Sequence, residues 1–216
     1  VLLAASVPAQ KGQSVLEVGC GTGAAALCLA VRLPEIRVTG IDAQSPLIEL
    51  AGNIAALNGL ETRAQFLSLD LLAVGDHLQS LKFDHVMANP PHHKKGSGNP
   101  SPDPLKAAAN VEGTAALKDW VAFCFDQVVE GGSVTFIHRF DRADELVALM
   151  EQGGAAKVLP LWPKFQGEGA KRVLVQAIKG TAGSRETRDG LVLHDVKEGY
   201  TSEAHAILRE VQALKI

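Results

Sequence analysis

Cysteine is scarce in this sequence, and no apolar run is long enough to cross a membrane. The three cysteines of the 216-residue chain, Cys20, Cys28 and Cys124, are irregularly spaced and form neither a disulfide framework nor a zinc motif, which indicates a reducing cytoplasm. The best apolar candidate, residues 23–33, includes Arg32 and falls short of the roughly 18 apolar residues that a membrane span needs. We therefore expect a cytoplasmic protein without a membrane partner.

A strong charge of either sign is also missing. The formal net charge of −3 at pH 7 argues against a surface that binds nucleic acid over its whole extent, but it is compatible with a local basic rim. A chain of this length fits one domain with a continuous core, and it carries no signal-peptide pattern. Because it begins at Val1 rather than Met, we expect a single domain over residues 1–216 whose upstream segment is missing.

Short apolar runs alternate with helical patterns along the chain. Strands are expected at 14–19, 36–42, 62–69, 83–88, 133–140, 157–162 and 172–178, with a short one near 191–194. Helices are expected at 24–33, 45–58, 76–81, 113–129 and 143–152 and from Ser202 onward, with Ser45 as an N-cap. The loop between the last two long strands is too short for a crossover helix, so these strands should be antiparallel. The pattern predicts an α/β fold, a doubly wound seven-stranded sheet with one antiparallel strand.

A glycine-rich turn, EVGCGTG at residues 17–23, follows the first strand and opens a helix. Glycines let the backbone approach a ligand closely, and a helix N-terminus offers free N–H groups. The turn also fits the dinucleotide fingerprint through Gly19, Gly21 and Ala24. Glu17 suits a cationic aminoacyl group better than a pyrophosphate, and Asp42, at the end of the second strand, can accept hydrogen bonds from both hydroxyls of a ribose. Asp70 ends the third strand, where it either holds the adenine amine of a cofactor or caps a helix.

The motif Asn89-Pro90-Pro91-His92 comes directly after the fourth strand. Two fixed φ angles keep this step extended and rigid, at the sheet edge where open α/β proteins bind ligands. The Asn89 carboxamide oxygen and the Pro90 carbonyl can then act as two acceptors for one planar amine. Such an arrangement favours the pyramidal geometry in which the nitrogen lone pair becomes available.

These motifs together resemble class I methyltransferases that act on amines. More narrowly, the chain resembles the bacterial tRNA1(Val) adenine-37 N6-methyltransferase family through VLLAAS, VLEVGCGTG, NPPHHKKGSGNPSPDPLKAAA, RVLVQAIKG and LVLHDVKEGYTSEAHAILR. The resemblance implies a Rossmann-like fold, S-adenosylmethionine as the cofactor and an adenine of RNA, in tRNA, as the methyl acceptor. It implies a catalytic set of Asn89, Pro90, Pro91 and His92, and a cofactor-binding set of Glu17, Gly19, Cys20, Gly21, Gly23, Asp42, Ala43, Asp70, Leu71 and Asn89.

One position departs from the family pattern. An aromatic Tyr or Phe usually follows the two prolines and stacks on the target base, whereas this chain has His92, followed by His93. An imidazole can also stack, but it has less area and a titratable charge. Adjacent histidines do not easily bind one metal ion together, and no carboxylate lies nearby at ligand spacing, so no metal site is expected.

RNA contacts are expected from two local basic loops, one with Lys94, Lys95 and Lys106 and one with Lys164, Lys171 and Arg172. Phe165 and Trp162 are candidates for stacking on a nucleotide, although Trp162, at the end of a strand, also fits core packing. Trp120, Phe123 and Phe125 lie within a helix and are assigned to core packing. Alternative functions are methylation of a protein glutamine at N5 and of a ribosomal RNA guanine at N2. An NAD-binding oxidoreductase and a non-catalytic S-adenosylmethionine-binding module represent different classes, and the oxidoreductase would leave the Asn89-Pro90-Pro91 step unexplained.

Overall fold

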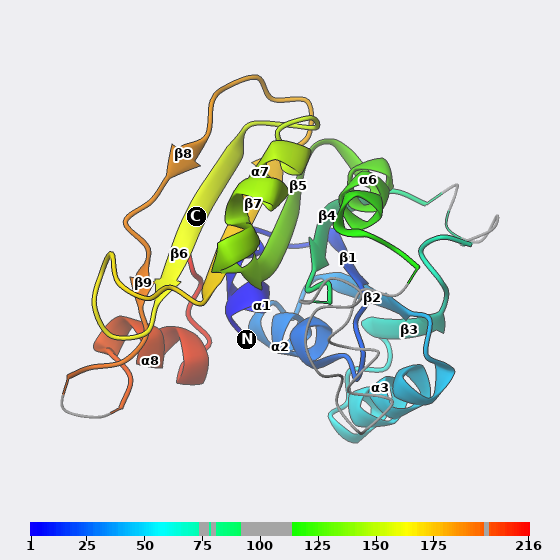
Figure 1. The fold of residues 1–216 in the computed structure, drawn as a ribbon. Coiled ribbons are helices and arrows are strands. Elements are labelled where there is room, and N and C mark those ends of the chain that lie inside the picture. The colour runs from blue at the N-terminus through cyan, green and yellow to red at the C-terminus, as the bar shows by residue number, and fades with distance from the viewer. Residues whose placement is uncertain (74–77, 79–80, 92–113, 197–198) are drawn as a thin grey trace.

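The computed structural model describes residues 1–73, 78, 81–91, 114–196 and 199–216, and Figure 1 shows how they are arranged. The strands are β1 Ser14–Val18, β2 Arg37–Asp42, β3 Ala64–Ser68, β4 Phe83–Ala88, β5 Val128–Arg139, β6 Ala156–Trp162, β7 Arg172–Ile178, β8 Glu186–Thr187 and β9 Leu191–Val192. The helices are α1 Leu2–Ser6, α2 Ala24–Arg32, α3 Ser45–Leu57, α6 Leu117–Gln127, α7 Ala143–Met150 and α8 Ser202–Arg209. The helix expected at 76–81 falls largely outside the described residues.

The strands form one sheet in the order β3-β2-β1-β4-β5-β7-β6-β8, and β9 also pairs with β6. Strand β7 is antiparallel to both β5 and β6, while all other pairs are parallel. The Rossmann-like α/β fold with one reversed strand is therefore confirmed. Two strands of two residues each, β8 and β9, extend the sheet beyond the seven long ones.

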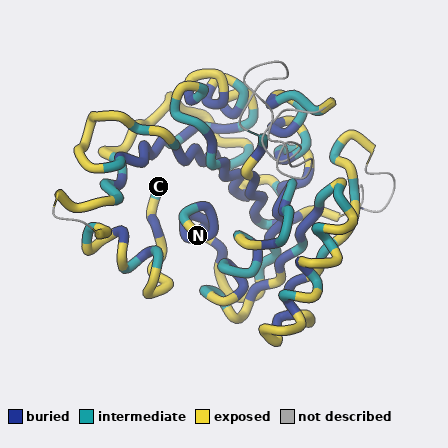
Figure 2. Tube along the Cα trace, turned by 60° about the horizontal axis from the view of Figure 1, so that its bottom comes forward, coloured by how far each residue is buried: buried dark blue, intermediate teal, exposed yellow. Residues whose placement is uncertain are grey.

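The long central strands are buried on both faces, as parallel strands covered by helices should be. Side chains of β4 alternate between two apolar clusters: Val86 and Ala88 face the cluster that includes α6 and α7, and Met87 faces the cluster that includes α1, α2 and α8. Figure 2 shows this buried sheet between the more exposed outer elements. Helices on both faces thus hold the sheet rigid behind its carboxyl edge.

The register of the sheet aligns the ends of neighbouring strands. Val18, the last residue of β1, pairs with Ile41 on one side and with Ala88 on the other. The residues that follow, Asp42 and Asn89, are therefore brought to the same sheet edge as the glycine-rich turn. This register gives the candidate site its position.

The start of α3 differs from the expectation. Ser45 is the first helical residue rather than the N-cap, and Gln44 occupies the N-cap position. The Gln44 N–H donates to Oδ1 of Asp42 at 2.9 Å, so a carboxylate two residues before Gln44 satisfies this free backbone donor. The prediction of Ser45 as the N-cap was wrong by one residue, because Ser45 is already helical and Gln44 precedes the helix without a side-chain cap hydrogen bond.

A polar cluster toward the opposite edge of the sheet joins β4 and β5 to Gln13, the residue before β1. His85 Nδ1 lies 2.7 Å from Ser133 Oγ, and His85 Nε2 lies 3.0 Å from Gln13 Oε1. Burial lowers the pKa of His85, although the neighbouring Asp84 acts against this shift. The folded protein therefore holds His85 in its neutral form at a pH where the unfolded chain begins to protonate it.

We expect the free energy of unfolding to decrease as the pH falls below about 6.5, because the unfolded chain binds a proton at His85 that the folded protein binds more weakly. Urea denaturation between about pH 5 and pH 7.5 measures this dependence. His85→Gln should reduce the slope, whereas His205→Gln, at an exposed site on α8, should leave it in place. Equal slopes in His85→Gln and the wild type would contradict the assignment.

Candidate active site

A cavity of about 770 Å³ lies at the carboxyl ends of β1, β2, β3 and β4. A cavity of this size is within the range of cofactor and small-ligand sites. Among the residues of the expected sites, those on its wall are Glu17, Gly19, Cys20, Gly21, Asp42, Ala43, Asp70, Leu71, Asn89 and Pro91. The structure thus brings together residues from four successive strand ends.

The glycine-rich turn forms one side of the cavity, and two of its positions, Gly19 and Gly21, favour glycine on different structural grounds. Gly19 has a φ of +67°, and a Cβ atom at this position would overlap the indole ring of Trp120. Gly21 has a φ of +54°, and a Cβ atom there would meet no protein atom within 4 Å. Because Gly21 lines the cavity, that open space is part of the cavity, and a ligand can approach the backbone closely.

Asp42 ties the glycine-rich turn to the next strand. Its Oδ2 accepts the Gly21 N–H at 2.9 Å, while Oδ1 accepts the Gln44 N–H at 2.9 Å. A carboxylate offers about four acceptor positions, so one position on each oxygen is left for a ligand hydroxyl. Asp42 can therefore hold the turn and bind a ribose at the same time.

Glu17 is 3% exposed, and its Oε2 accepts the Ala26 N–H at the start of α2 at 2.7 Å. Burial raises the pKa of Glu17 to about 8, although the hydrogen bond from Ala26 lowers it. The side chain lies on the cavity wall. A cationic group bound beside it would favour the ionised carboxylate.

Asp70 stabilises a turn and lies on the cavity wall, while its expected contact with the cofactor adenine stays a prediction. Its Oδ1 accepts the Leu72 N–H at 2.9 Å and so stabilises the turn after β3, while the exposed residue also lines the cavity. The neighbouring Leu71 supplies an apolar surface on the same wall.

The three residues of the Asn-Pro-Pro step differ in burial and in whether they line the cavity. Asn89 is exposed and Pro91 half-buried, and both line the cavity, whereas Pro90 is buried and does not line it. Gly23 also lies off the wall, at the N-cap of α2, where it packs against Phe66 and Ala51. His92, Lys94, Lys95 and Lys106 fall outside the described residues.

Several wall residues were not expected from the sequence. Trp120 of α6 belongs to the hydrophobic core, as expected, but it also lines the cavity, and so does Ile137 of β5. Residues Val1 to Leu3, at the start of α1, and Leu208 of α8 also line the cavity. Trp120 and Leu208 follow ordinary amphipathic patterns, so their contact with the cavity has no local sequence signal.

Comparison with known proteins identifies the class of this site. Residues 9–170 match the family described as "Methyltransferase domain". The chain belongs to this family. It is an S-adenosylmethionine-dependent methyltransferase, and the glycine-rich turn, Asp42 and Asp70 line the cavity described above.

Among its relatives, the methyltransferase is 25% identical over 212 residues to a tRNA1(Val) (adenine(37)-N6)-methyltransferase of Vibrio campbellii, a match covering 97% of this chain and 85% of the relative. It is 30% identical over 158 residues to a release factor glutamine methyltransferase of Aliivibrio fischeri, covering 68% of this chain and 53% of the relative. The crystal structure of a predicted O-methyltransferase, protein Atu636 from Agrobacterium tumefaciens, matches all of this chain and 97% of its own with a TM-score of 0.82 and 24% identity, which supports the fold.

The observed site fits S-adenosylmethionine, which supplies the methyl group when it is bound. The open space at Gly21 admits a ligand against the backbone, Asp42 keeps two acceptor positions for hydroxyls, and Glu17 places a buried carboxylate on the wall.

Among the described residues, no helix has the length and apolar character to cross a bilayer, and no three His, Cys, Asp or Glu side chains are grouped to hold a metal ion.

We expect Asp42→Ala to weaken cofactor binding by about 1–3 kcal/mol, because it leaves ligand hydroxyls and the Gly21 N–H without their acceptor. Asp42→Asn, which keeps one carbonyl oxygen, should have a smaller effect. Titration calorimetry with S-adenosylmethionine measures the change. The control is Asp144→Ala, which removes an exposed carboxylate paired with Arg185 on the surface. Unchanged affinity in Asp42→Ala would remove Asp42 from the cofactor site.

We also expect the affinity for S-adenosylmethionine to rise between about pH 6 and pH 8, with release of a proton on binding. Glu17 is largely protonated in this interval because its pKa is raised to about 8, and the cationic cofactor would require the carboxylate form. Calorimetry in buffers of different ionisation enthalpy counts the protons. Glu17→Gln should abolish the proton release, and a variant that still releases it would refute the assignment.

Proposed function

We propose that this methyltransferase transfers the methyl group to the exocyclic N6 amine of an adenine in tRNA. The observation that carries the proposal is the position of Asn89, exposed on the cavity wall directly after β4 and followed by two prolines. A rigid carboxamide at this place is suited to a planar amine. The near full-length similarity to a tRNA1(Val) adenine-N6-methyltransferase supports an adenine of tRNA as the acceptor.

In the proposed mechanism, the chain positions the acceptor without a strong general base. The Asn89 carboxamide oxygen accepts one hydrogen of the N6 amine, and the Pro90 carbonyl, in the peptide bond to the wall residue Pro91, accepts the other, so that the lone pair points into the cavity. Buried Pro90 restricts the backbone behind this contact, and Pro91 adds an apolar surface. Fixed dipoles and proximity lower the barrier. The methylated amine then loses its extra proton to water.

A basic rim near the cavity supports an RNA substrate. Strand β6 ends and β7 begins at the carboxyl edge of the sheet, so exposed Lys164 and Lys171 and half-buried Arg172 lie at this edge. Phe165, in the same loop, is 51% exposed and is available for stacking on a base. Trp162 is buried, and its Nε1 donates to the Asp189 carbonyl at 2.7 Å, so it belongs to the core.

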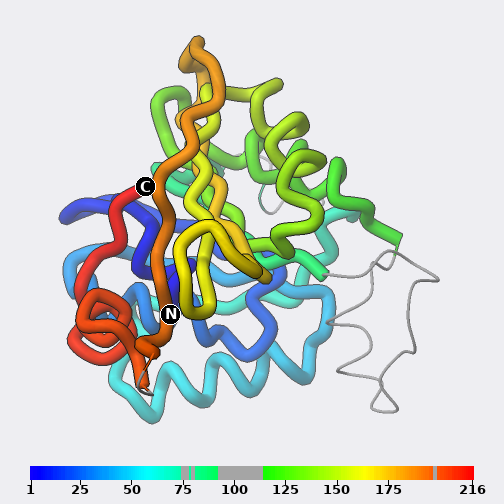
Figure 3. The backbone as a smooth tube through the Cα atoms, turned by 60° about the vertical axis from the view of Figure 1, so that its left-hand side comes forward, coloured from blue at the N-terminus to red at the C-terminus, as the bar shows by residue number. Residues whose placement is uncertain are grey.

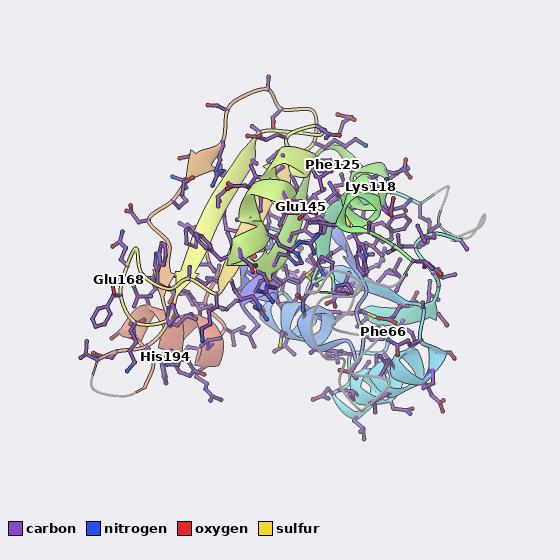
Figure 4. All side chains as sticks on the ribbon, in the orientation of Figure 1. Phe66, Lys118, Phe125, Glu145, Glu168 and His194 are labelled. Atoms are coloured by element: carbon purple, nitrogen blue, oxygen red, sulfur yellow. The ribbon has the colours of Figure 1, made fainter. Side chains whose placement is uncertain are left out.

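Figure 4 shows that the β6–β7 loop with Glu168 and the turn with His194 lie close together. The His194 N–H donates to the Pro163 carbonyl at 2.9 Å, which joins the two segments. His194 also stacks on Tyr200, with ring centroids 5.1 Å apart. This exposed aromatic pair adds to the candidate RNA surface beside the lysines.

Methylation of a protein glutamine is the second candidate, because the chain is also similar to a release factor glutamine methyltransferase. A carboxamide nitrogen could use the same two acceptors. Incubation with labelled S-adenosylmethionine and separate pools of tRNA, ribosomal RNA and protein distinguishes the candidates. N6-methyladenosine recovered from tRNA would support the proposal, while label in N5-methylglutamine or N2-methylguanosine would replace it.

We expect Asn89→Ala to abolish most methyl transfer while cofactor affinity changes by less than about threefold, because the amine loses one of its two acceptors. Initial rates with the labelled pool and calorimetry with S-adenosylmethionine measure the two effects separately. Asn58→Ala, at an exposed position after α3, is the control. Near wild-type turnover in Asn89→Ala would assign the Asn-Pro-Pro step a purely structural role.

A further inference from the structure

Two helices that are distant in the sequence, α1 and α8, contact each other and line the same cavity. Leu2 and Leu3 contribute from the first helix, Val1 lies just before it, and Leu208 contributes from the last helix. Figure 3 shows α8 and the chain that follows it beside the N-terminal segment. The wall formed by Leu2 and Leu208 is apolar, in contrast to the carboxylates on the β1–β3 side.

Hydrogen bonds hold α8 before its first turn and after its last. Thr201 Oγ1 accepts the Ala204 N–H at 3.1 Å and donates to the Val192 carbonyl at 2.7 Å, which ties the start of α8 to β9. After the helix, the Leu214 N–H donates to the Ala5 carbonyl in α1 at 2.9 Å. Ile207 and Leu214 are buried in the same cluster as Leu3. Leu208 is therefore presented to the cavity from a fixed helix.

The position of this wall separates it from the cofactor groups. Asp42 and Asp70 follow β2 and β3, at one end of the cavity, whereas α1 packs against β4 and β5, and α8 packs against β9 on the far side of the sheet. The wall thus lies on the side of Asn89 and Ile137. A flat group held by Asn89 would have this apolar surface within reach.

Both α1 and α8 lie outside the residues that match the methyltransferase family. The methyltransferase family match ends at residue 170, so α8 lies beyond it, and α1 lies before its start at residue 9. The match to the tRNA1(Val) relative covers 97% of the chain and so must include α8. The helix that supplies Leu208 therefore lies outside the general family match, and both the tRNA1(Val) relative and the Atu636 structure match the chain over this helix.

We propose that α8 forms the acceptor-side wall of the cavity and that Leu208 is a specificity-determining residue for the methyl acceptor. The inference rests on the proposed function insofar as the acceptor is a flat ring. Leu208 packs against the ring face or edge and selects acceptors by shape, while the cofactor is bound at the other end. Filling this space should therefore exclude the acceptor and spare the cofactor.

The test compares Leu208→Trp with the wild type in two measurements. Calorimetry measures the dissociation constant of S-adenosylmethionine and so tests the cofactor end of the cavity. The acceptor end is tested by KM and kcat, measured with whichever pool, nucleic acid or protein, the wild type labels. We expect KM for the acceptor to rise at least about tenfold while the dissociation constant for the cofactor stays within about threefold. Leu208→Met, which adds little volume, should raise KM less than Leu208→Trp does, and Glu203→Trp, at an exposed position of α8 off this cavity, controls for added bulk.

An unchanged acceptor KM in Leu208→Trp, or a loss of cofactor affinity as large as the change in KM, would overturn the inference. If the wild type labels ribosomal RNA or protein instead of tRNA, the proposed function fails, and the Leu208 comparison is made with that acceptor. A wild type that labels none of the pools would overturn both. Thermal melting of each variant identifies unfolded protein, in which case Leu208→Ala, expected to raise KM more modestly, replaces Leu208→Trp.

Discussion

The contact between the Trp120 indole and the backbone of Gly19 joins the hydrophobic core to the cavity. The ring occupies the space that any side chain at residue 19 would need, so the first turn after β1 and the position of α6 constrain each other. Trp120 is at the same time part of the core cluster with Val18 and Val86. The cavity floor is therefore as rigid as the core behind it, which limits the reorganisation needed when a ligand binds.

Side chains of different chemical type lie along the carboxyl edge of the sheet. Because β1 lies between β2 and β4 in register, a carboxylate from β2 and a carboxamide from β4 lie on either side of the glycine-rich turn. The buried Glu17 adds a carboxyl group whose pKa is raised by burial, so that it is largely protonated near neutral pH and ionises when a cation binds beside it. One end of the cavity thus suits hydroxyls and a cation, and the other suits an amine.

The sequence predicted the parts of the site that local rules govern. Asp42, Asp70 and Asn89 were recognisable because each follows a short apolar run that had to be a strand, and parallel strands end at one edge. Trp120 and Leu208 could not be assigned to the cavity, because an apolar residue on a helix gives the same pattern whether it faces the core or a ligand. The N-cap of α3 was assigned to Ser45, one residue too late, because the helix begins at Ser45 without any side-chain cap that the sequence could signal. Gly23 was grouped with the other glycines of its motif, although it packs against Phe66 away from the wall.

The hydrogen bond between Leu214 and Ala5 also has a consequence for the order in which the site is assembled. It connects residues that are almost the whole chain apart, so it closes a very long loop and contributes little until the sheet between them has formed. During synthesis, α1 leaves the ribosome long before α8. The turn around Gly19 can therefore fold against α6 before α8 completes the apolar wall of the cavity.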